Sequence, residues 1–389
     1  MSFRYEYCGK LLTGNNFWAC YAFETARDLL LKRKPRVIKI LTNAGLHQLS
    51  KLFPEIEFRK KCDEHAYFVH EDYSVRFFTI DYLAEPLDKN RAETGVQKKA
   101  LKMAAEYSPF TINSFFYDFE RDIFHDPLDA YSMLKGRVIK TINSPERTAE
   151  TFPTIVLKTA KVVSETGFKI DKTLQRFLKK NETLYNYREI DENIAGDFLD
   201  ICVSGRAYEA LSLLDECGVL EMLLPEVTLL KTVNQDKEYH PEGNGFRHTL
   251  ECLKCVKKPN KTLMMSILLH DTGKAITAAG GKNKKPFPNH SYVSKTIAKK
   301  VLCRFFYNNE EMDEVFFLVK NHMILDAVDR LPENRLRSLF SSPYFSNLLE
   351  LYRADLESGY HNIDSYYLAA RVYREFLRKD KLRRQGVYV

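Results

Sequence analysis

The sequence lacks any run of about 20 apolar residues and any secretory signal pattern near its first residue. Because a helix that spans a bilayer needs about 20 predominantly apolar residues, no membrane span is expected. The eight cysteines are scattered and form no paired framework, which is typical of proteins from a reducing compartment. These absences predict a cytoplasmic protein that makes no contact with a membrane.

One pair of cysteines, Cys252 and Cys255, has the C-x-x-C spacing found in zinc and redox sites. A zinc ribbon needs a second such pair, and a redox motif needs a preceding strand and the start of a helix. Neither feature is present here, and the surrounding pattern is that of the middle of a helix. We therefore interpret both residues as half-buried structural cysteines.

Neither sign of charge dominates the composition. Lysine and arginine number 59 against 52 for aspartate and glutamate, which leaves a net charge of +7. This balance suits a nucleic-acid or phosphate partner, although solvated lysines alone produce the same number. With 44% hydrophobic and 29% charged residues, the chain is typical of a globular protein. At 389 residues it exceeds one ordinary compact core, so two or three domains are expected.

The hydrophobic pattern divides the chain into a mixed first part and a helical remainder. Over roughly the first 140 residues, short helical and β-type segments alternate, as they do in a mixed α/β domain. The pattern predicts a helix over Phe17–Leu31, a strand over Val37–Leu41, and a hairpin of Ala66–Val69 with Ser74–Asp81. After Pro153 the pattern is helical, so the overall class is α+β.

The pair His270-Asp271 follows the apolar segment Leu263–Leu269 and precedes Thr272-Gly273-Lys274. A buried helix therefore carries an imidazole and a carboxylate at its C-terminal end. Burying that pair without compensation is costly, so a metal ion or another ionic partner is the natural explanation. Imidazole and carboxylate groups together suit borderline or hard divalent ions.

Histidines are concentrated in the same part of the chain. Of the ten, six fall between His240 and His361, in helical contexts. A single histidine is more often a core or surface residue than a ligand, but the combination is a stronger signal. The candidate metal ligands are His248, His270, Asp271, His290, His322 and Asp355.

These segments resemble, in order, the HD domain of bacterial CCA-adding enzymes. The matching stretches are Tyr239-His240-Pro241-Glu242-Gly243, Arg247-His248-Thr249-Leu250, Leu268-Leu269-His270-Asp271-Thr272-Gly273-Lys274, Asn289-His290, Asn321-His322-Met323 and Arg353-Ala354-Asp355. The resemblance implies that His248, His270, Asp271 and Asp355 bind a first metal ion. It also implies that His290 and His322 complete a second site, with Asp271 bridging the two.

An HD domain implies hydrolysis of a phosphoester. A divalent ion acidifies bound water and polarises a phosphoryl oxygen, which makes Asp271 a candidate catalytic residue. Lys274 is a second candidate, placed either to neutralise a phosphate or simply as a solvated cation at a helix end. His240 and Glu242 are candidates for an outer layer of the site. The ion could be Mg²⁺, Mn²⁺, Ni²⁺, Co²⁺ or Fe²⁺, and no other cofactor is expected.

The resemblance extends upstream to class II CCA-adding enzymes and bacterial poly(A) polymerases. It rests on Ala26-Arg27-Asp28-Leu29-Leu30, Thr42-Asn43-Ala44, Phe110-Thr111-Ile112-Asn113, Gly136-Arg137-Val138-Ile139 and Gly218-Val219-Leu220. It implies a small nucleotidyltransferase-like head over residues 1–140, an all-α neck over residues 141–228, and an HD domain with a basic helical tail over residues 229–389. A nucleotide or RNA, including tRNA, is then the expected partner, and the oligomeric state is left open.

The head departs from the family at the positions that approach the triphosphate and at those that hold metal ions. Phe23-Glu24 stands where the family has Gly-Gly, and Val37 and Lys39 stand where it has Asp-x-Asp. Arg76 stands at the position of the third carboxylate. At about 4 Å and an effective dielectric constant of about 20, each cation placed against a metal ion costs several kcal/mol. The substitutions therefore predict a head without nucleotidyltransferase activity.

Three functions follow from these patterns. The first is a metal-dependent phosphodiesterase or phosphatase that acts on a nucleotide, a 2′,3′-cyclic phosphate or an RNA end. The second is a non-enzymatic RNA-binding protein that uses the metal structurally. The third is a working CCA-adding enzyme or poly(A) polymerase. The missing carboxylates of the head favour the first.

Overall fold

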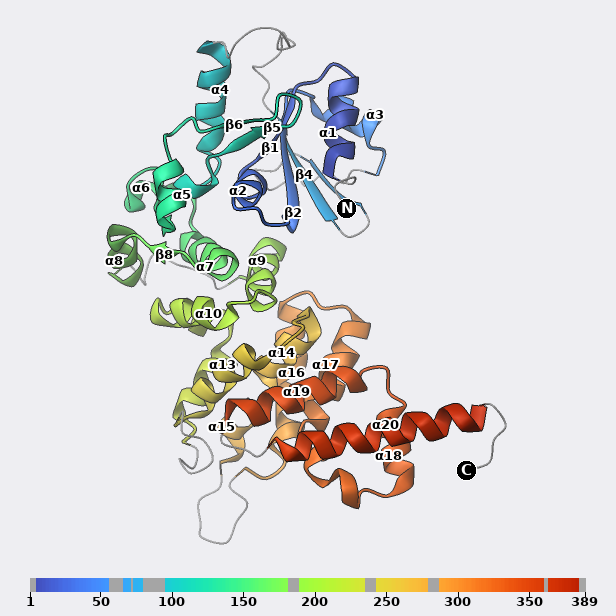
Figure 1. Ribbon diagram of the computed structural model, residues 1–389. Helices are drawn as coiled ribbons and strands as arrows, with labels where there is room; N and C mark the ends of the chain where they lie inside the picture. The colour runs from blue at the N-terminus through green and yellow to red at the C-terminus, as the bar shows by residue number, and fades with distance from the viewer. Residues whose placement is uncertain are drawn as a thin grey trace. The chain divides into compact units, whose positions relative to one another are not determined.

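The computed structural model describes residues 5–55, 66–70, 73–79, 95–180, 189–234, 243–278, 287–359 and 363–384 (Figure 1). The chain forms two compact units. Unit 1 comprises residues 1–155 and 168–177, and unit 2 comprises residues 156–167 and 178–389. Unit 1 contains a β-sheet and several helices, and unit 2 is helical where it is described. This agrees with the predicted α+β class. The finer division into head, neck and HD domain stays a prediction.

Unit 1 is organised around a sheet with six described strands in the order β3-β4-β2-β1-β5-β6. Strands β2 and β4 run parallel, and the other neighbours run antiparallel. Its elements are α1 (Tyr5–Gly14), β1 (Ala19–Ala22), α2 (Glu24–Leu30), β2 (Val37–Thr42), α3 (Leu46–Leu52), β3 (Ala66–His70), β4 (Tyr73–Thr79), α4 (Gly95–Ala105), η1 (Thr111–Asn113), β5 (Phe116–Asp118), β6 (Ile123–His125), α5 (Tyr131–Gly136), β7 (Val138–Ile139), α6 (Pro145–Thr151), β8 (Lys169–Ile170) and most of α8 (Lys172–Lys180). Strands β7 and β8 form a separate parallel pair.

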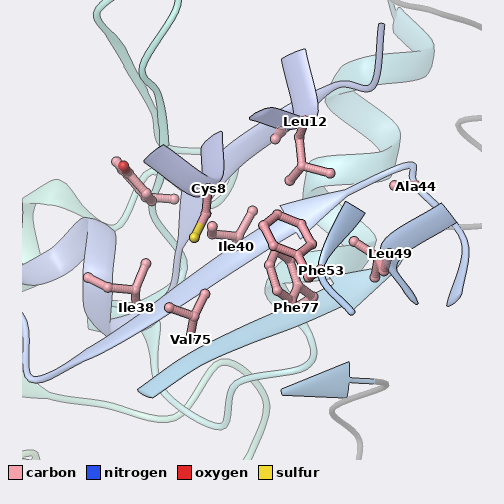
Figure 2. Close-up of a cluster of buried hydrophobic side chains, with 11 residues drawn as sticks. Cys8, Leu12, Ile38, Ile40, Ala44, Leu49, Phe53, Val75 and Phe77 are labelled. Carbon is pink, nitrogen blue, oxygen red and sulfur yellow. The ribbon is translucent and has the colours of Figure 1, made fainter. Parts of the chain in front are cut away.

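Apolar side chains cover both faces of this sheet. Ile40 of β2 and Phe77 of β4 pack with residues of α1 and α3 on one face (Figure 2). Leu41 and Phe78, one position further along the same strands, belong to a second cluster that includes α4. Because successive side chains of a strand point to opposite faces, the central strands need apolar residues at almost every position.

Strand β1 corrects one prediction from the sequence. The pattern predicted a single helix over Phe17–Leu31, whereas the chain forms β1 and then α2, separated by Phe23 at a φ of 57°. All four residues of β1 are buried, because the strand lies between β2 and β5. A strand buried on both faces has no alternation to distinguish it from a helix. The predicted strand β2 and the hairpin of β3 and β4 are confirmed.

Unit 2 consists of packed helices, and among its described residues none of the helices is both long and apolar enough to cross a membrane. They are α7 (Ile155–Thr166), α9 (Glu192–Cys202), α10 (Ala207–Glu216), α11 (Val219–Leu223), α12 (Pro225–Thr228), η3 (Leu229–Thr232), α13 (Gly245–Cys255), α14 (Lys261–Leu269), α15 (Lys274–Thr277), α16 (His290–Arg304), α17 (Asn309–Asn321), η4 (Ile324–Arg330), α18 (Glu333–Phe340), α19 (Phe345–Ser358) and α20 (Asp364–Arg384).

Helix α14 is the centre of unit 2 (Figure 1). It begins at the side-chain cap of Asn260, which accepts from the N–H of Leu263, and every residue from Thr262 to Leu269 is buried. Helices α13, α16, α17 and α19 all pack against it. The residues that follow α14, His270 and Asp271, therefore enter the middle of the unit, where only 1% and 2% of their surfaces are exposed.

A buried arginine connects α13 and α19 through a hydrogen bond. The side chain of Arg353 is 2% exposed and forms ion pairs with Glu350 and Glu357 of its own helix. Its guanidinium also donates to the carbonyl of Cys255, the last residue of α13. This contact satisfies a carbonyl at a helix end, which has no partner inside its own helix. It also sets the spacing between α13 and α19, which carry His248 and Asp355.

Gly273 lets α16 approach the end of α14. A Cβ at this position would lie 2.2 Å from the carbonyl oxygen of His290 and 2.8 Å from the backbone nitrogen of Ser294. The Gly273 N–H donates to Ser294 Oγ at 2.8 Å. The absence of a side chain therefore allows two backbone segments to meet, and it brings His290 close to Asp271.

We expect Gly273→Ala to lower the free energy of unfolding by about 1–3 kcal/mol, the usual range for an overpacked interior. The clash is with backbone, so α16 must move and carry His290 away from Asp271. Thermal unfolding and metal-binding titrations of the variant measure the two effects.

Gly196→Ala in α9 is the matched control, because a Cβ there meets nothing within 4 Å. Alanine is favoured over glycine inside a helix by roughly 0.5–1 kcal/mol, so this variant should be slightly more stable than the parent. Equal stability of the Gly273 variant and the parent would contradict the packing argument.

Candidate metal centre

Three imidazoles of the centre are anchored in the same way. Nδ1 of His270, His290 and His322 each lies 2.7–3.1 Å from the carbonyl oxygen three residues earlier in the chain. Because a carbonyl oxygen only accepts hydrogen bonds, each Nδ1 carries the hydrogen and each neutral ring keeps its lone pair on Nε2. The backbone thus prepares three Nε2 atoms as ligands.

The fourth imidazole, His248 in α13, is oriented by a hydroxyl group. Ser358 Oγ donates to the carbonyl of Asp355 at 2.8 Å and lies 3.2 Å from Nδ1 of His248. Since the hydroxyl has already used its proton, it accepts from Nδ1–H, and Nε2 again keeps the lone pair. Nε2 faces Asp355 Oδ1 at 2.9 Å, an arrangement that is favourable with a proton or a metal ion between the two atoms.

The donor atoms fall into two groups, within each of which all atoms lie within 4.8 Å of one another. The first group is His248, Cys252, His270 and Asp355, and the second is Asp271, His290 and His322. The six predicted ligands are thus brought together, although Asp271 lies with the second group rather than the first.

Asp271 nevertheless lies between the two groups. Its Oδ2 is 3.4 Å from Nε2 of His270, and its Oδ1 is 3.4 Å from Nε2 of His290 and 3.7 Å from Nε2 of His322. One carboxylate therefore faces ligands of both groups. This is the geometry that a bridging carboxylate requires.

The second group contains two imidazoles whose Nε2 atoms face each other at 3.1 Å. With both Nδ1 atoms protonated, two lone pairs would meet across this distance, and only a proton or a metal ion relieves the repulsion. Burial, together with the neighbouring His270, lowers the pKa of His322 to about 3. A proton is therefore disfavoured on His322 at neutral pH, whereas a metal ion satisfies both rings.

Nε2 of His270 is the strongest single observation in favour of a metal site. The His270 side chain is 2% exposed, and Nε2 has no hydrogen-bond partner among the described residues. Buried polar atoms are nearly always paired, because leaving one unpaired costs about 1–3 kcal/mol. A metal ion held by the first group would remove that cost, so the residues present fit a divalent ion.

The carboxylates of the centre stay ionised. Burial alone would raise the pKa of Asp271, but His270 and Lys274 outweigh it and hold that pKa well below its usual range. Lys274 Nζ lies 2.6 Å from Asp271 Oδ2, and the carboxylate in turn raises the lysine's pKa. The pKa of Asp355 is also lowered, because its interaction with His248 outweighs the effect of burial.

Two residues that contact the predicted ligands, Cys252 and Ser358, were not predicted from the sequence. Cys252, interpreted as a half-buried structural cysteine, is 1% exposed and lies among the donors of the first group. Its spacing of one helical turn from His248 was the available signal. Ser358 carried no signal, because its role depends on the packing of α19 against α13. The predicted outer residues His240 and Glu242 lie outside the described residues.

In unit 1, the positions that resemble the polymerase carboxylates hold cations. Lys39 of β2 and Arg76 of β4 are directly opposite each other in the parallel register. Lys39 Nζ pairs with Glu24 at 3.0 Å, and Glu24 Oε1 also accepts from Asn113 Nδ2 at 3.1 Å. The pKa of Glu24 is lowered to about 2, because Lys39 and Arg27 outweigh the effect of burial. Glu24, a carboxylate beside Lys39, is thus already paired.

Comparison with known proteins relates the chain to RNA-processing enzymes. No protein-family model matches it. Poly(A) polymerase I of Escherichia coli O157:H7 is 27% identical over 224 residues, which cover 54% of this chain and 47% of that protein. Multifunctional CCA protein of Acinetobacter baumannii (strain SDF) is 31% identical over 190 residues, 46% of this chain and 43% of that protein. The chain spans about half the length of the curated relatives it matches.

Solved structures with the same fold cover almost all of the chain. The Bacillus stearothermophilus CCA-adding enzyme in complex with CTP has a TM-score of 0.58 at 18% identity and covers 94% of this chain and 80% of its own. A tRNA-processing enzyme in an apo form has a TM-score of 0.58 at 16% identity, with coverage of 97% and 99%. The chain therefore has the fold of the CCA-adding enzymes, and it is homologous in sequence to these enzymes and to bacterial poly(A) polymerase over about half of its length.

Proposed function

We propose that this chain is a metal-dependent phosphohydrolase whose reaction takes place at the centre formed by α13, α14, α16, α17 and α19. The observation that carries the proposal is the convergence of four imidazole Nε2 atoms on two ionised carboxylates, with the buried Nε2 of His270 left without a partner among the described residues. The chemistry of this donor set fits divalent ions, and the resemblance to HD domains supports the same assignment.

Each residue has a role that follows from its contacts. His248, His270 and Asp355 would hold one ion, His290 and His322 would hold a second, and Asp271 would bridge them. When bound, such ions supply a hydroxide nucleophile near neutral pH and withdraw charge from a phosphoryl group. Lys274 is held beside Asp271 at 2.6 Å, and its raised pKa keeps it cationic, so it can bind a phosphate oxygen.

The proposed substrate class is a nucleotide, a 2′,3′-cyclic phosphate or the end of an RNA chain. The supporting observation is the fold, because one of the similar structures is a tRNA nucleotidyltransferase complexed with a primer tRNA and an incoming ATP analog. The net charge of +7 also suits an anionic partner.

A second candidate is nucleotidyl transfer to an RNA 3′ end, and the names of the relatives favour it over hydrolysis. Relatives in sequence include poly(A) polymerase I and multifunctional CCA proteins, and similar solved structures include CCA-adding enzymes. The geometry of unit 1 speaks against it. Lys39 and Arg76 stand opposite each other at positions where two metal ions need carboxylates, and two cations would repel those ions. The two functions use different residues, so separate variants distinguish them.

We expect the purified chain, tested separately with Mn²⁺, Co²⁺, Ni²⁺ and Mg²⁺, to hydrolyse a generic aryl phosphodiester and 2′,3′-cyclic AMP with at least one of these ions. Asp271→Asn should reduce kcat/KM by more than about 100-fold, because residues outside the ligand shell already account for about 10–100-fold in metal enzymes. His47→Ala, which changes an exposed histidine of α3, is the matched control and should leave the rate unchanged. Absence of turnover with every metal would rule out the proposal.

We expect no incorporation of CMP or AMP when the chain is incubated with CTP, ATP, Mg²⁺ and a tRNA that lacks its 3′-terminal CCA. The physical reason is the repulsion of metal ions by Lys39 and Arg76. Incorporation that is lost in Asp28→Asn and retained in Asp271→Asn would establish the second candidate instead. Salt-sensitive tRNA binding without either reaction, unaffected by His270→Ala, would point to the non-enzymatic alternative.

Removal of metal should destabilise unit 2 even where no substrate is present. An ion that binds only the folded state adds about 2.7 kcal/mol of stability at a free concentration about 100 times its Kd. We therefore expect Mn²⁺ or Co²⁺ to raise the Tm of the chelator-treated chain by several degrees. In His322→Ala the increase should shrink, because one of the two imidazoles of the second group is lost. An identical increase in both proteins would contradict metal binding there.

A further inference from the structure

Cys252 shares the inner face of α13 with His248. The two residues are four positions apart, so their side chains lie one above the other on the helix. Cys252 Sγ is 3.6 Å from Nε2 of His248 and 3.1 Å from Ser358 Oγ. It is 1% exposed, whereas Cys255, three positions later, is partly exposed and lies outside the donor group.

The distance between sulfur and nitrogen matches that of two ligands on one ion. With bonds of about 2.3 Å to sulfur and 2.0–2.1 Å to nitrogen, tetrahedral geometry places the two atoms ~3.6 Å apart. The observed separation is 3.6 Å. An S–H group that donates to this nitrogen reaches the same separation, so the assignment depends on the other donor atoms around it.

A second observation points to the same ligand position. Nε2 of His270 is buried and has no hydrogen-bond partner in the described part of the chain. It lies within 4.8 Å of Sγ of Cys252, Nε2 of His248 and an oxygen of Asp355. One sulfur, two nitrogens and one oxygen can therefore share one ion, and Asp271 would be a fifth ligand where it bridges the two groups.

We propose that Cys252 ligates the first metal ion as a thiolate, so that this site is a Cys-His₂-Asp site that selects Zn²⁺, Fe²⁺ or Co²⁺ over Mg²⁺. On binding, the metal–sulfur bond forms as the S–H bond breaks, and the proton leaves to solvent. A thiolate is a soft ligand, which Mg²⁺ disfavours and these transition-metal ions accept. The inference rests on the proposed metal centre and adds the identity of the ion that it holds.

The second group has no sulfur donor, so the two positions would differ in preference. Asp271, His290 and His322 offer one oxygen and two nitrogens, a set that accepts a wider range of divalent ions. The chain would then combine one strongly held transition-metal ion with a second ion that is exchanged more readily. Mg²⁺ alone should support little hydrolysis, even though it is abundant in assays of nucleotide chemistry.

The test is a titration of the metal-free, full-length chain with Co²⁺ under reducing, oxygen-free conditions. A bound thiolate produces a sulfur-to-cobalt charge-transfer band in the near ultraviolet, which imidazole and carboxylate ligands do not. We expect this band in the parent and in Cys255→Ser, and its loss in Cys252→Ser. The Co²⁺ affinity of Cys252→Ser should fall by more than ~10-fold, whereas its Mn²⁺ affinity should change little. A band that persists in Cys252→Ser would overturn the proposal.

X-ray absorption of the Zn²⁺-loaded parent tests the same point without a variant, in case Cys252→Ser does not fold. We expect a sulfur scatterer at about 2.3 Å from zinc, and a shell of nitrogen and oxygen alone would overturn the proposal. Failure here is distinguishable from failure of the proposed function. Hydrolysis that depends on Asp271 but shows no metal–sulfur bond would refute only the role of Cys252. A metal–sulfur bond without hydrolysis would refute only the activity.

Discussion

Unit 2 places a histidine and an aspartate at the end of its most buried helix, and most of its other features compensate for that placement. Helix α14 is buried along almost its whole length, so His270 and Asp271 enter a region from which water is excluded. Burial of such groups is costly unless charge and hydrogen bonds compensate. Lys274 pairs with Asp271, and a backbone carbonyl holds Nδ1 of His270, but Nε2 of His270 is left for a metal ion.

Hydrogen bonds from Nδ1 orient the neighbouring imidazole rings as well. Carbonyl groups accept from Nδ1 of His290 and His322, and Ser358 accepts from Nδ1 of His248, so every Nε2 points its lone pair at another donor atom. Lone pairs that face one another are unfavourable unless a proton or a metal ion lies between them. An ion bound between these donor atoms would therefore also stabilise the folded arrangement of the side chains. This linkage explains why metal removal is expected to affect folding as well as catalysis.

In unit 1, cations stand where the resemblance to the polymerases implies a second metal site. Strands β2 and β4 place Lys39 and Arg76 opposite each other, at the positions where the resemblance to the polymerases implies carboxylates. Lys39 pairs with Glu24, which Asn113 also contacts. Overall likeness in fold persists through such changes, because the buried apolar residues that form the sheet are independent of the polar residues at its edge. Fold comparison and site chemistry therefore point to different functions here.

The amino-acid sequence alone determined the helical character of unit 2 and the central strand β2, because helical periodicity and strand composition are local features. It also singled out six residues that the structure brings together, and their role as ligands stays a prediction. It misassigned β1 as helix, since a strand buried on both faces has no alternation. Cys252 was not among the predicted ligands. Its spacing of four residues from His248 indicates a shared helix face, but not which element packs against that face. Only the tertiary structure decided which donors share an ion position. The grouping of the donor atoms depends on the packing of α13 against α19 and on the close approach of α16 to Gly273. Both are contacts between residues far apart in the chain.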